Sequence, residues 1–124
     1  MYIAFDFDGT CVTNKWPDTG EKLEGCVETL KLLATLGHKL ILNTCREGLL
    51  LADAIRWCDK QKIPLYAVND NPEARAKWGI CRKVWADLYI DDHALGVPLR
   101  DGCVDWAKTK ELIKEYLNNG KKDC

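Results

Sequence analysis

Four short apolar segments, separated by stretches with helical spacing, are the feature that most constrains the fold of this chain. The apolar segments are residues 2–7, 39–44, 64–68 and 87–90. Apolar runs of this length are typical of buried strands, whereas apolar residues three or four positions apart are typical of helices. Strands that alternate with helices form right-handed β-α-β units and a mainly parallel sheet covered on both faces. The pattern therefore predicts an α/β domain.

Two helices are expected between the first three strands. Residues 21–36 have apolar side chains at helical spacing, and Gly37 is well placed to cap the C-terminus of this helix. Residues 44–47 match a capping box, which would begin a second helix that ends near Gln61.

The rest of the chain predicts shorter elements and one long helix. A short helix is expected within 69–83 and a short fifth strand at 97–99, while residues 11–20 are expected to form a small flap. The polar residues 118–124 are expected to be a frayed tail. The last helix should begin near Asp105 and bury one side, made of Trp106, Leu112, Ile113, Tyr116 and Leu117.

Length and charge limit the classes of function. The 124 residues suffice for one domain with its own hydrophobic core, so we expect a single domain over 1–124. The formal net charge of −1 gives no overall attraction to nucleic acid or to an acidic membrane surface. We also find no arginine-rich run and no interleaving of aromatic and basic residues. We therefore expect no membrane partner, and nucleic acid only as a substrate.

The start of the chain and its thiols indicate the cell compartment. Met1 is followed directly by the apolar residues 2–5, without a basic leader or a long hydrophobic segment, so we expect a cytoplasmic protein. An odd number of cysteines without a C-x-x-C pair favours free thiols over disulfides or a zinc site. The seven cysteines are Cys11, Cys26, Cys45, Cys58, Cys81, Cys103 and Cys124.

Acidic residues follow two of the predicted strands. Asp6 and Asp8 follow the first strand, and Asp91 and Asp92 follow the fourth. Ligands of open parallel sheets bind beyond the carboxyl ends of the strands, where these side chains should meet. Carboxylates crowded together repel one another unless a cation neutralises them, and oxygen ligands without histidine favour magnesium over zinc. The sequence therefore predicts a Mg²⁺ site.

Each of these features also has a purely structural explanation. Asp8-Gly9 is a common turn dipeptide, Thr44 can be no more than a helix N-cap, and the Asp91-Asp92 pair can cap a following helix. Lys83 can be a solvated surface lysine. Taken together, however, the same parts suit phosphoryl transfer, which needs a nucleophile, a general acid/base, a cation and groups that hold phosphate oxygens.

In chain order, the candidate motifs are YIAFDFDGT at 2–10, KLILNT at 39–44, Lys83, and DLYIDD at 87–92. These resemble the four motifs of the haloacid dehalogenase (HAD) superfamily. The resemblance implies a HAD-like, Rossmann-like three-layer sandwich with a mainly parallel sheet. It also implies a phosphatase or phosphotransferase, because members that cleave carbon–halogen bonds generally lack an acid at the position of Asp8.

The resemblance gives roles to residues at the expected strand ends. Asp6 resembles the nucleophile and a magnesium ligand, and Asp8 the general acid/base, with its backbone carbonyl on the metal. Lys77 competes with Lys83 for the lysine role, and the choice of direct metal ligand between the two last aspartates stays open. The remaining roles are phosphate binding by Thr44 and Lys83, direct metal binding by Asp91, and support of the metal by Asp92.

Further candidates lie close to these motifs. Gly9 and Cys45 complete the expected phosphate-binding residues, since backbone N–H groups can hold phosphate oxygens. Arg46 is a candidate for an extra contact to substrate or phosphate, with an exposed arginine of the first helical turn as the alternative. The others are Asn69, which could orient a ligand, His93, expected at the surface or behind the ligands, and Trp16, which could close over a bound substrate.

The gaps between the motifs are too short for a separate cap domain. The resemblance is therefore to capless members, whose open sites accept macromolecular ends or large phosphorylated compounds, or are covered by a neighbouring subunit. A phosphorylated small molecule and the terminal phosphate of a larger substrate both remain open, and so does an oligomer.

Two other classes of function remain. One is a receiver-like phosphoacceptor module, although receivers place the acidic pair on the first strand and the acceptor on the third. The other is a Mg²⁺-dependent binding module that has lost turnover. A phosphomutase is disfavoured, because no cap would retain the intermediate.

Overall fold

The computed structural model describes residues 1–120, which form a four-stranded parallel sheet and four helices. The strands are β1 (Tyr2–Phe5), β2 (Lys39–Leu42), β3 (Ala67–Val68) and β4 (Leu88–Ile90), in the order β3-β2-β1-β4. After β1, the chain adds β2 and then β3 on one side of β1, and β4 pairs with the other side of β1. The reversal lies between β1 and β4, which is where ligands bind in open α/β sheets. The predicted α/β, Rossmann-like parallel sheet is confirmed.

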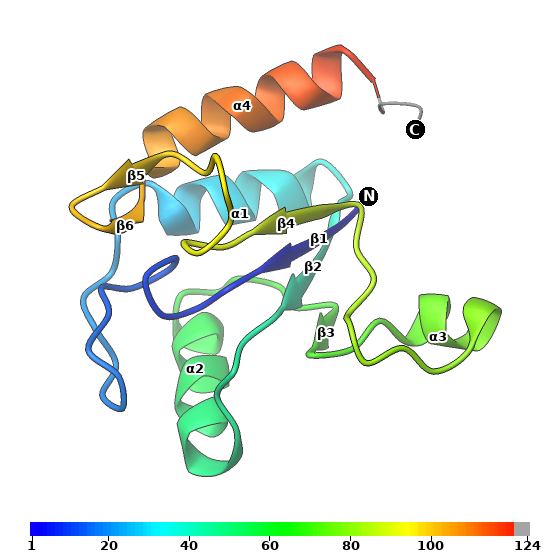
Figure 1. Ribbon diagram of the computed structural model, residues 1–124, viewed down its shortest axis with the longest axis horizontal. Coiled ribbons are helices and arrows are strands. Elements are labelled where there is room, and N and C mark those ends of the chain that lie inside the picture. Colours follow the sequence, from blue (N-terminus) through cyan, green and yellow to red (C-terminus); the bar gives the residue numbers. More distant parts are fainter. Residues whose placement is uncertain (121–124) are drawn as a thin grey trace.

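The helices are α1 (Cys26–Thr35), α2 (Gly48–Lys60), α3 (Pro72–Trp78) and α4 (Trp106–Asn118). Figure 1 shows α4 running alongside α1, whereas α3 lies apart from both. No helix within residues 1–120 is long and apolar enough to cross a membrane. The six cysteines of this part of the chain are free thiols, and Cys124 lies outside it.

The alternating side chains of β1 and β2 divide the core into two clusters. Ile3, Phe5, Leu40 and Leu42 belong to the larger cluster, together with buried side chains of α1, α2 and α4. Ala4 and Ile41 point the other way, into a smaller cluster that contains Val84 and Ala86. The segment that leads from α3 to β4 therefore covers the opposite face of the sheet.

Two of the predicted helix starts are wrong. The first helix begins at Cys26 instead of Glu21, because residues 21–22 are held at the base of the flap. The Thr13 N–H donates to the Glu21 carbonyl oxygen (2.8 Å), and the Glu21 N–H donates to the Thr13 hydroxyl (2.9 Å). The second begins at Gly48, and its N-cap, Glu47, makes no side-chain capping bond. The predicted capping box does not form, because the Thr44 hydroxyl accepts a hydrogen bond from the Arg46 N–H (3.1 Å) and the chain stays in a loop.

The C-terminal part also differs from the prediction in detail. The short fifth strand is β5 (Leu99–Arg100), and it pairs antiparallel with an unpredicted strand, β6 (Cys103–Val104). In α4, Trp106 and Ile113 are buried as predicted, but Leu112 is 48% exposed. The tail was predicted to fray from residue 118, but α4 includes that residue; positions 121–124 lie outside the described residues.

One contact ties α4 to the loop that follows β1. The Trp106 side chain is almost fully buried, and its indole N–H donates a hydrogen bond to the Thr10 carbonyl oxygen (2.6 Å). The backbone N–H of Val104 donates to the Gly9 carbonyl oxygen (2.9 Å). Together these bonds fix the D-x-D-G-T loop against the C-terminal part of the domain.

Candidate functional site

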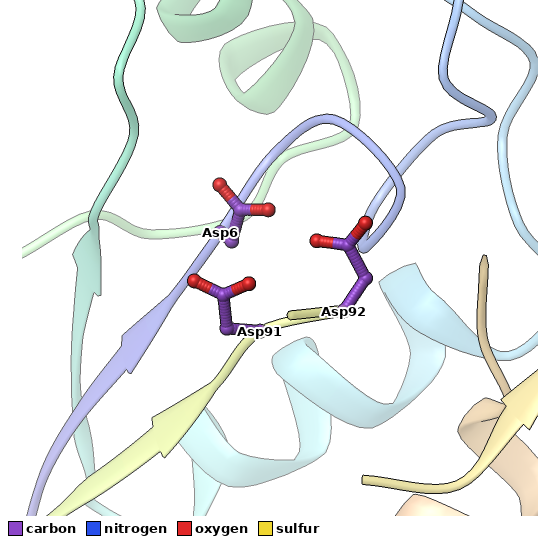
Figure 2. A group of neighbouring side chains, drawn as sticks. All are labelled: Asp6, Asp91 and Asp92. Carbon is purple, nitrogen blue, oxygen red and sulfur yellow. The ribbon is translucent and has the colours of Figure 1, made fainter. Parts of the chain in front are cut away.

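Three aspartates meet at the carboxyl ends of β1 and β4 (Figure 2). Asp6 directly follows β1, and Asp91 and Asp92 directly follow β4. The backbone N–H of Asp6 donates to the Ile90 carbonyl oxygen (2.9 Å), which keeps the two strand ends level. One carboxylate oxygen of each aspartate lies within 4.8 Å of the other two. The structure thus brings together these three predicted metal ligands.

A buried threonine hydroxyl fixes two of the three aspartates. The Thr10 hydroxyl donates to Oδ2 of Asp6 (3.2 Å) and accepts a hydrogen bond from the backbone N–H of Asp92 (3.1 Å). Because Thr10 is fully buried, its hydroxyl has a defined orientation in the loop. The sequence prediction gave Thr10 no role, although it lies in the quoted motif; its place four residues after Asp6 was the available signal.

Gly9 makes room for Asp92. Its φ angle is +78°, and a Cβ atom at this position would lie 2.2 Å from Oδ2 of Asp92. Glycine is the residue that adopts such a φ without strain. The backbone N–H of Gly9 donates to the Val12 carbonyl oxygen (2.8 Å), so in this structure it is not free to hold a phosphate oxygen.

The electrostatics of the cluster favour a bound cation. Burial, a hydrogen bond with Asp92 and the negative charge of Asp91 raise the pKa of Asp6 to about 8. Within the described part of the chain, no lysine or arginine forms an ion pair with any of the three aspartates. Three oxygen donors without a basic partner suit a hard divalent cation such as Mg²⁺. The residues present therefore fit the predicted magnesium site.

His93 lies at the border of this cluster. Its Nε2 atom is 3.5 Å from Oδ2 of Asp92, and its side chain is 84% exposed. Its backbone N–H donates to Oδ1 of Asp91 (2.8 Å), which orients that carboxylate. The contribution of His93 to the geometry of the site therefore comes mainly from its backbone.

Asp8 does not belong to the cluster of three aspartates, and its carboxylate forms an ion pair with Arg46. Nε and Nη2 of Arg46 donate to the two carboxylate oxygens of Asp8 at 2.8 and 2.7 Å. Arg46 is only 3% exposed, so the alternative of an exposed first-turn arginine is wrong. The hydrogen bonds with Asp8 raise the pKa of the guanidinium above its ordinary value. Arg46 and Asp8 thus form a bidentate ion pair whose guanidinium is almost fully buried.

The same guanidinium holds the flap. It donates to the carbonyl oxygens of Pro17 (3.3 Å) and Asp18 (2.9 Å), and to that of Leu50 in α2 (3.3 Å). It also lies 5.1 Å from the centre of the Phe7 ring. One side chain therefore connects the flap, the loop after β1 and the start of α2.

The predicted phosphate-binding residues of the second motif lie beside β3. The backbone N–H of Thr44 donates to Oδ1 of Asn69 (2.8 Å), which joins the loops that follow β2 and β3. Asn69 has a φ angle of +50°, an uncommon conformation that asparagine tolerates better than most residues. Cys45 is exposed. Asn69 thus orients the backbone of Thr44. That it orients a ligand, as expected from the sequence, stays a prediction.

Neither candidate lysine contacts the three aspartates in this structure. The Lys83 ammonium lies 5.0 Å from the centre of the Tyr89 ring, and that of Lys77 lies 5.2 Å from the centre of the Trp78 ring. Lys83 thus lies over a ring of β4, whereas Lys77 lies over its neighbour in α3. The choice between the two lysines stays a prediction.

The flap residue Trp16 is 60% exposed. It lies one residue before Pro17, whose carbonyl oxygen Arg46 binds, so the anchored part of the flap begins directly beside it. This position is compatible with the predicted movement of Trp16 toward a bound molecule.

No family model matches the sequence, and no curated protein matches it. A solved structure, described as that of a conserved protein coded by a locus from Bacteroides thetaiotaomicron, matches with a TM-score of 0.80. The two sequences are 46% identical, and the match covers 93% of this chain and 90% of the other. The chain therefore belongs to the same family as this conserved Bacteroides thetaiotaomicron protein.

Proposed function

We propose that the chain is a Mg²⁺-dependent phosphomonoesterase of the haloacid dehalogenase type that forms an aspartyl-phosphate at Asp6. The observation that carries the proposal is the convergence of Asp6, Asp91 and Asp92 at the point where the strand order reverses. A carboxylate at the end of a central strand, crowded by two others, suits a nucleophile that works beside a cation. The chain order of the motifs supports the same proposal.

The metal would be held by the carboxylates of Asp6, Asp91 and Asp92 and by the backbone carbonyl of Asp8. When bound, Mg²⁺ supplies positive charge that neutralises the phosphoryl oxygens. Thr10 keeps Asp6 in position through its hydroxyl, so the oxygen of Asp6 that is not bound to Thr10 is the better placed to attack.

Two displacements complete the reaction. In the first, a carboxylate oxygen of Asp6 bonds to phosphorus, the ester P–O bond breaks, and the leaving oxygen takes a proton from Asp8. In the second, Asp8 takes a proton from water as the water oxygen bonds to phosphorus. The P–O bond to Asp6 then breaks, which releases inorganic phosphate and restores both carboxyl groups to their first states.

The Arg46–Asp8 pair adds a step before the first displacement. While both oxygens of Asp8 accept hydrogen bonds from Arg46, neither oxygen is free to contact a leaving group. The phosphate group of a substrate is a competing bidentate acceptor for the guanidinium. We infer that a bound phosphate draws Arg46 from Asp8, so that Asp8 can take a proton from solvent and pass it to the leaving oxygen. Thr44 and Lys83 would hold the remaining phosphate oxygens.

The substrate would be a phosphomonoester with an open approach to the site. The links between motifs are short, and none of them makes a separate domain over the three aspartates, so we retain the capless assignment as part of the proposal. A phosphorylated small molecule and the terminal phosphate of a larger compound both fit this arrangement.

The Arg46–Asp8 pair also favours a second candidate function. A phosphoacceptor module needs Mg²⁺ and an aspartate but no general base, and an Asp8 that stays bound to Arg46 would leave the acyl phosphate long-lived. Acetyl phosphate distinguishes the two functions, because a phosphoacceptor would keep a stable label on Asp6, whereas a phosphatase would lose it within one turnover.

Substitution of Asp6 and Asp8 tests the catalytic assignment. With p-nitrophenyl phosphate and a panel of phosphomonoesters, the parent should release phosphate only when Mg²⁺ is present. Asp6→Asn should abolish release, and Asp8→Asn should lower kcat about 100-fold or more, the usual range for general acid–base catalysis. Asp59→Asn, at an exposed position of α2, is the matched control and should leave kcat unchanged. Phosphate release that persists in Asp6→Asn would contradict the assignment.

The raised pKa of Asp6 predicts a dependence of stability on pH. The folded, metal-free protein holds a proton on Asp6 up to about pH 8, whereas the unfolded chain loses it near the ordinary value of 3.8. The unfolding free energy should therefore fall as pH rises from about 4 to about 8. Asp6→Asn removes this term, so its gain in Tm over the parent should be larger at pH 8 than at pH 5, by on the order of 10 °C.

Added Mg²⁺ is the control for that comparison. It should raise the Tm of the parent more at pH 8 than at pH 5, because the ion binds the ionised carboxylates, and it should raise that of Asp6→Asn much less. A parent and a variant with parallel Tm values across this range would contradict the electrostatic account of the site.

Substitution of Arg46 tests its two roles. Arg46→Gln leaves the Asp8 carboxylate unpaired and should lower the unfolding free energy by about 2–4 kcal/mol in urea titrations. The double variant Asp8→Asn with Arg46→Gln should be more stable than Arg46→Gln alone, because no unpaired charge remains. Arg46→Gln should also weaken inhibition by inorganic phosphate about tenfold. Arg56→Gln, at an exposed ion pair of α2, is the control. Unchanged inhibition would exclude Arg46 as a phosphate ligand.

A further inference from the structure

Exposed rings gather on the segment that runs from α3 to β4. Trp78 is 55% exposed and Trp85 36%, and their ring centres lie 5.0 Å apart with an angle of 54° between the planes. Ile80, between them in the sequence, is 91% exposed. Large apolar side chains grouped on a surface in this way are typical of interaction sites.

The same segment is strongly basic. Residues 75–85 contain two arginines and two lysines but no aspartate or glutamate, although the whole chain has a net charge of −1. Arg75 is paired with Asp70, whereas Lys77 and Arg82 form no ion pair within residues 1–120. Aromatic and basic residues therefore do interleave in this segment, contrary to our expectation from the sequence. Its charges remain available to an anionic partner.

The rings rest on a fixed base. Val84 and Ala86 are buried in the smaller core cluster, and the Trp85 ring packs edge-on against that of Tyr2, with centres 5.9 Å apart. The Trp85 ring therefore contacts both the Tyr2 ring and the Trp78 ring. A ring that is already ordered loses little conformational entropy when a partner stacks on it.

This surface is separate from the three aspartates. Tyr2 begins β1 and Asp6 follows its end, so the two lie about 13 Å apart at the usual rise of a strand. Figure 1 shows α3 and the chain that follows it at the end of the sheet where β1 begins. The inference below therefore does not rest on the proposed phosphatase activity.

We propose that the surface formed by Lys77, Trp78, Ile80, Arg82 and Trp85 binds single-stranded nucleic acid. Proteins that bind single strands combine aromatic rings on which bases stack with cations that contact phosphates. The Lys77 ammonium lies over the Trp78 ring, 5.2 Å from its centre, so a base that takes its place on the ring would leave the ammonium within reach of a phosphate. Arg82 supplies a second cation close in the chain. A membrane would instead favour a broad aliphatic area, and within this surface Ile80 is the one aliphatic side chain.

Fluorescence anisotropy with a labelled 15-nucleotide oligothymidine tests the proposal on the full chain. At low salt the parent should bind it, and the affinity should fall as salt rises. Trp78→Ala should weaken binding about tenfold, in line with the loss of one stacked base. Arg82→Gln should weaken binding a few-fold and reduce the slope of log K against log salt by about one. Leu95→Ala and Arg56→Gln, both at exposed positions elsewhere, are the matched controls and should bind as the parent does.

Four outcomes would overturn the proposal, provided that circular dichroism shows each variant to be folded. They are no binding by the parent at low salt, unchanged binding by Trp78→Ala, displacement of the oligonucleotide by polyphosphate at equal phosphate concentration, and stronger binding to vesicles of phosphatidylserine. The third would indicate a site for charge alone, and the fourth a site for membranes.

Discussion

Mutual repulsion among the carboxylates of Asp6, Asp91 and Asp92 is the constraint around which the structure is arranged. The parallel pairing of β1 and β4 places these groups together, and burial makes their ionisation costly. Several neighbouring contacts act to hold the cluster in spite of this cost. The Thr10 hydroxyl bridges Asp6 and the Asp92 backbone, and Gly9 leaves the space that Asp92 occupies. Trp106 in turn fixes the loop that carries Thr10.

The carboxylate of Asp8 has a cationic partner, unlike those of the three clustered aspartates. The buried guanidinium of Arg46 neutralises its charge and also donates hydrogen bonds to two carbonyl oxygens of the flap. The two acidic groups of the D-x-D motif therefore differ in their surroundings, one without a cationic partner and the other with a bidentate one. In the proposed reaction a bound cation would favour the ionised form of Asp6, and Arg46 would have to leave Asp8 before Asp8 could act as the acid. Because Arg46 also binds the flap, a ligand that binds Arg46 would change the position of the flap.

The sequence was sufficient to predict the parallel sheet and the proximity of Asp6 to Asp91 and Asp92. Apolar runs specify buried strands, and parallel strands bring their carboxyl ends to one edge, so the neighbours of Asp6 followed from topology. The pairing of Arg46 with Asp8 could not be predicted, because the two residues are 38 positions apart and local pattern favoured a helix start. The capping box failed for that reason, since the contacts of Arg46 with Asp8 and the flap outweighed a local preference. Burial of Leu112 was likewise overestimated, because helical spacing does not tell how wide the covered face is.

The most direct test of the central claim is detection of a covalent intermediate on Asp6. The parent would be mixed with excess p-nitrophenyl phosphate and Mg²⁺, quenched in acid, and reduced with borohydride, which converts an aspartyl-phosphate to homoserine. Peptide mass spectrometry then locates the modified residue. The account predicts homoserine at position 6, and none without Mg²⁺. Phosphate release without homoserine at position 6, or with homoserine at Asp91 or Asp92 instead, would contradict it.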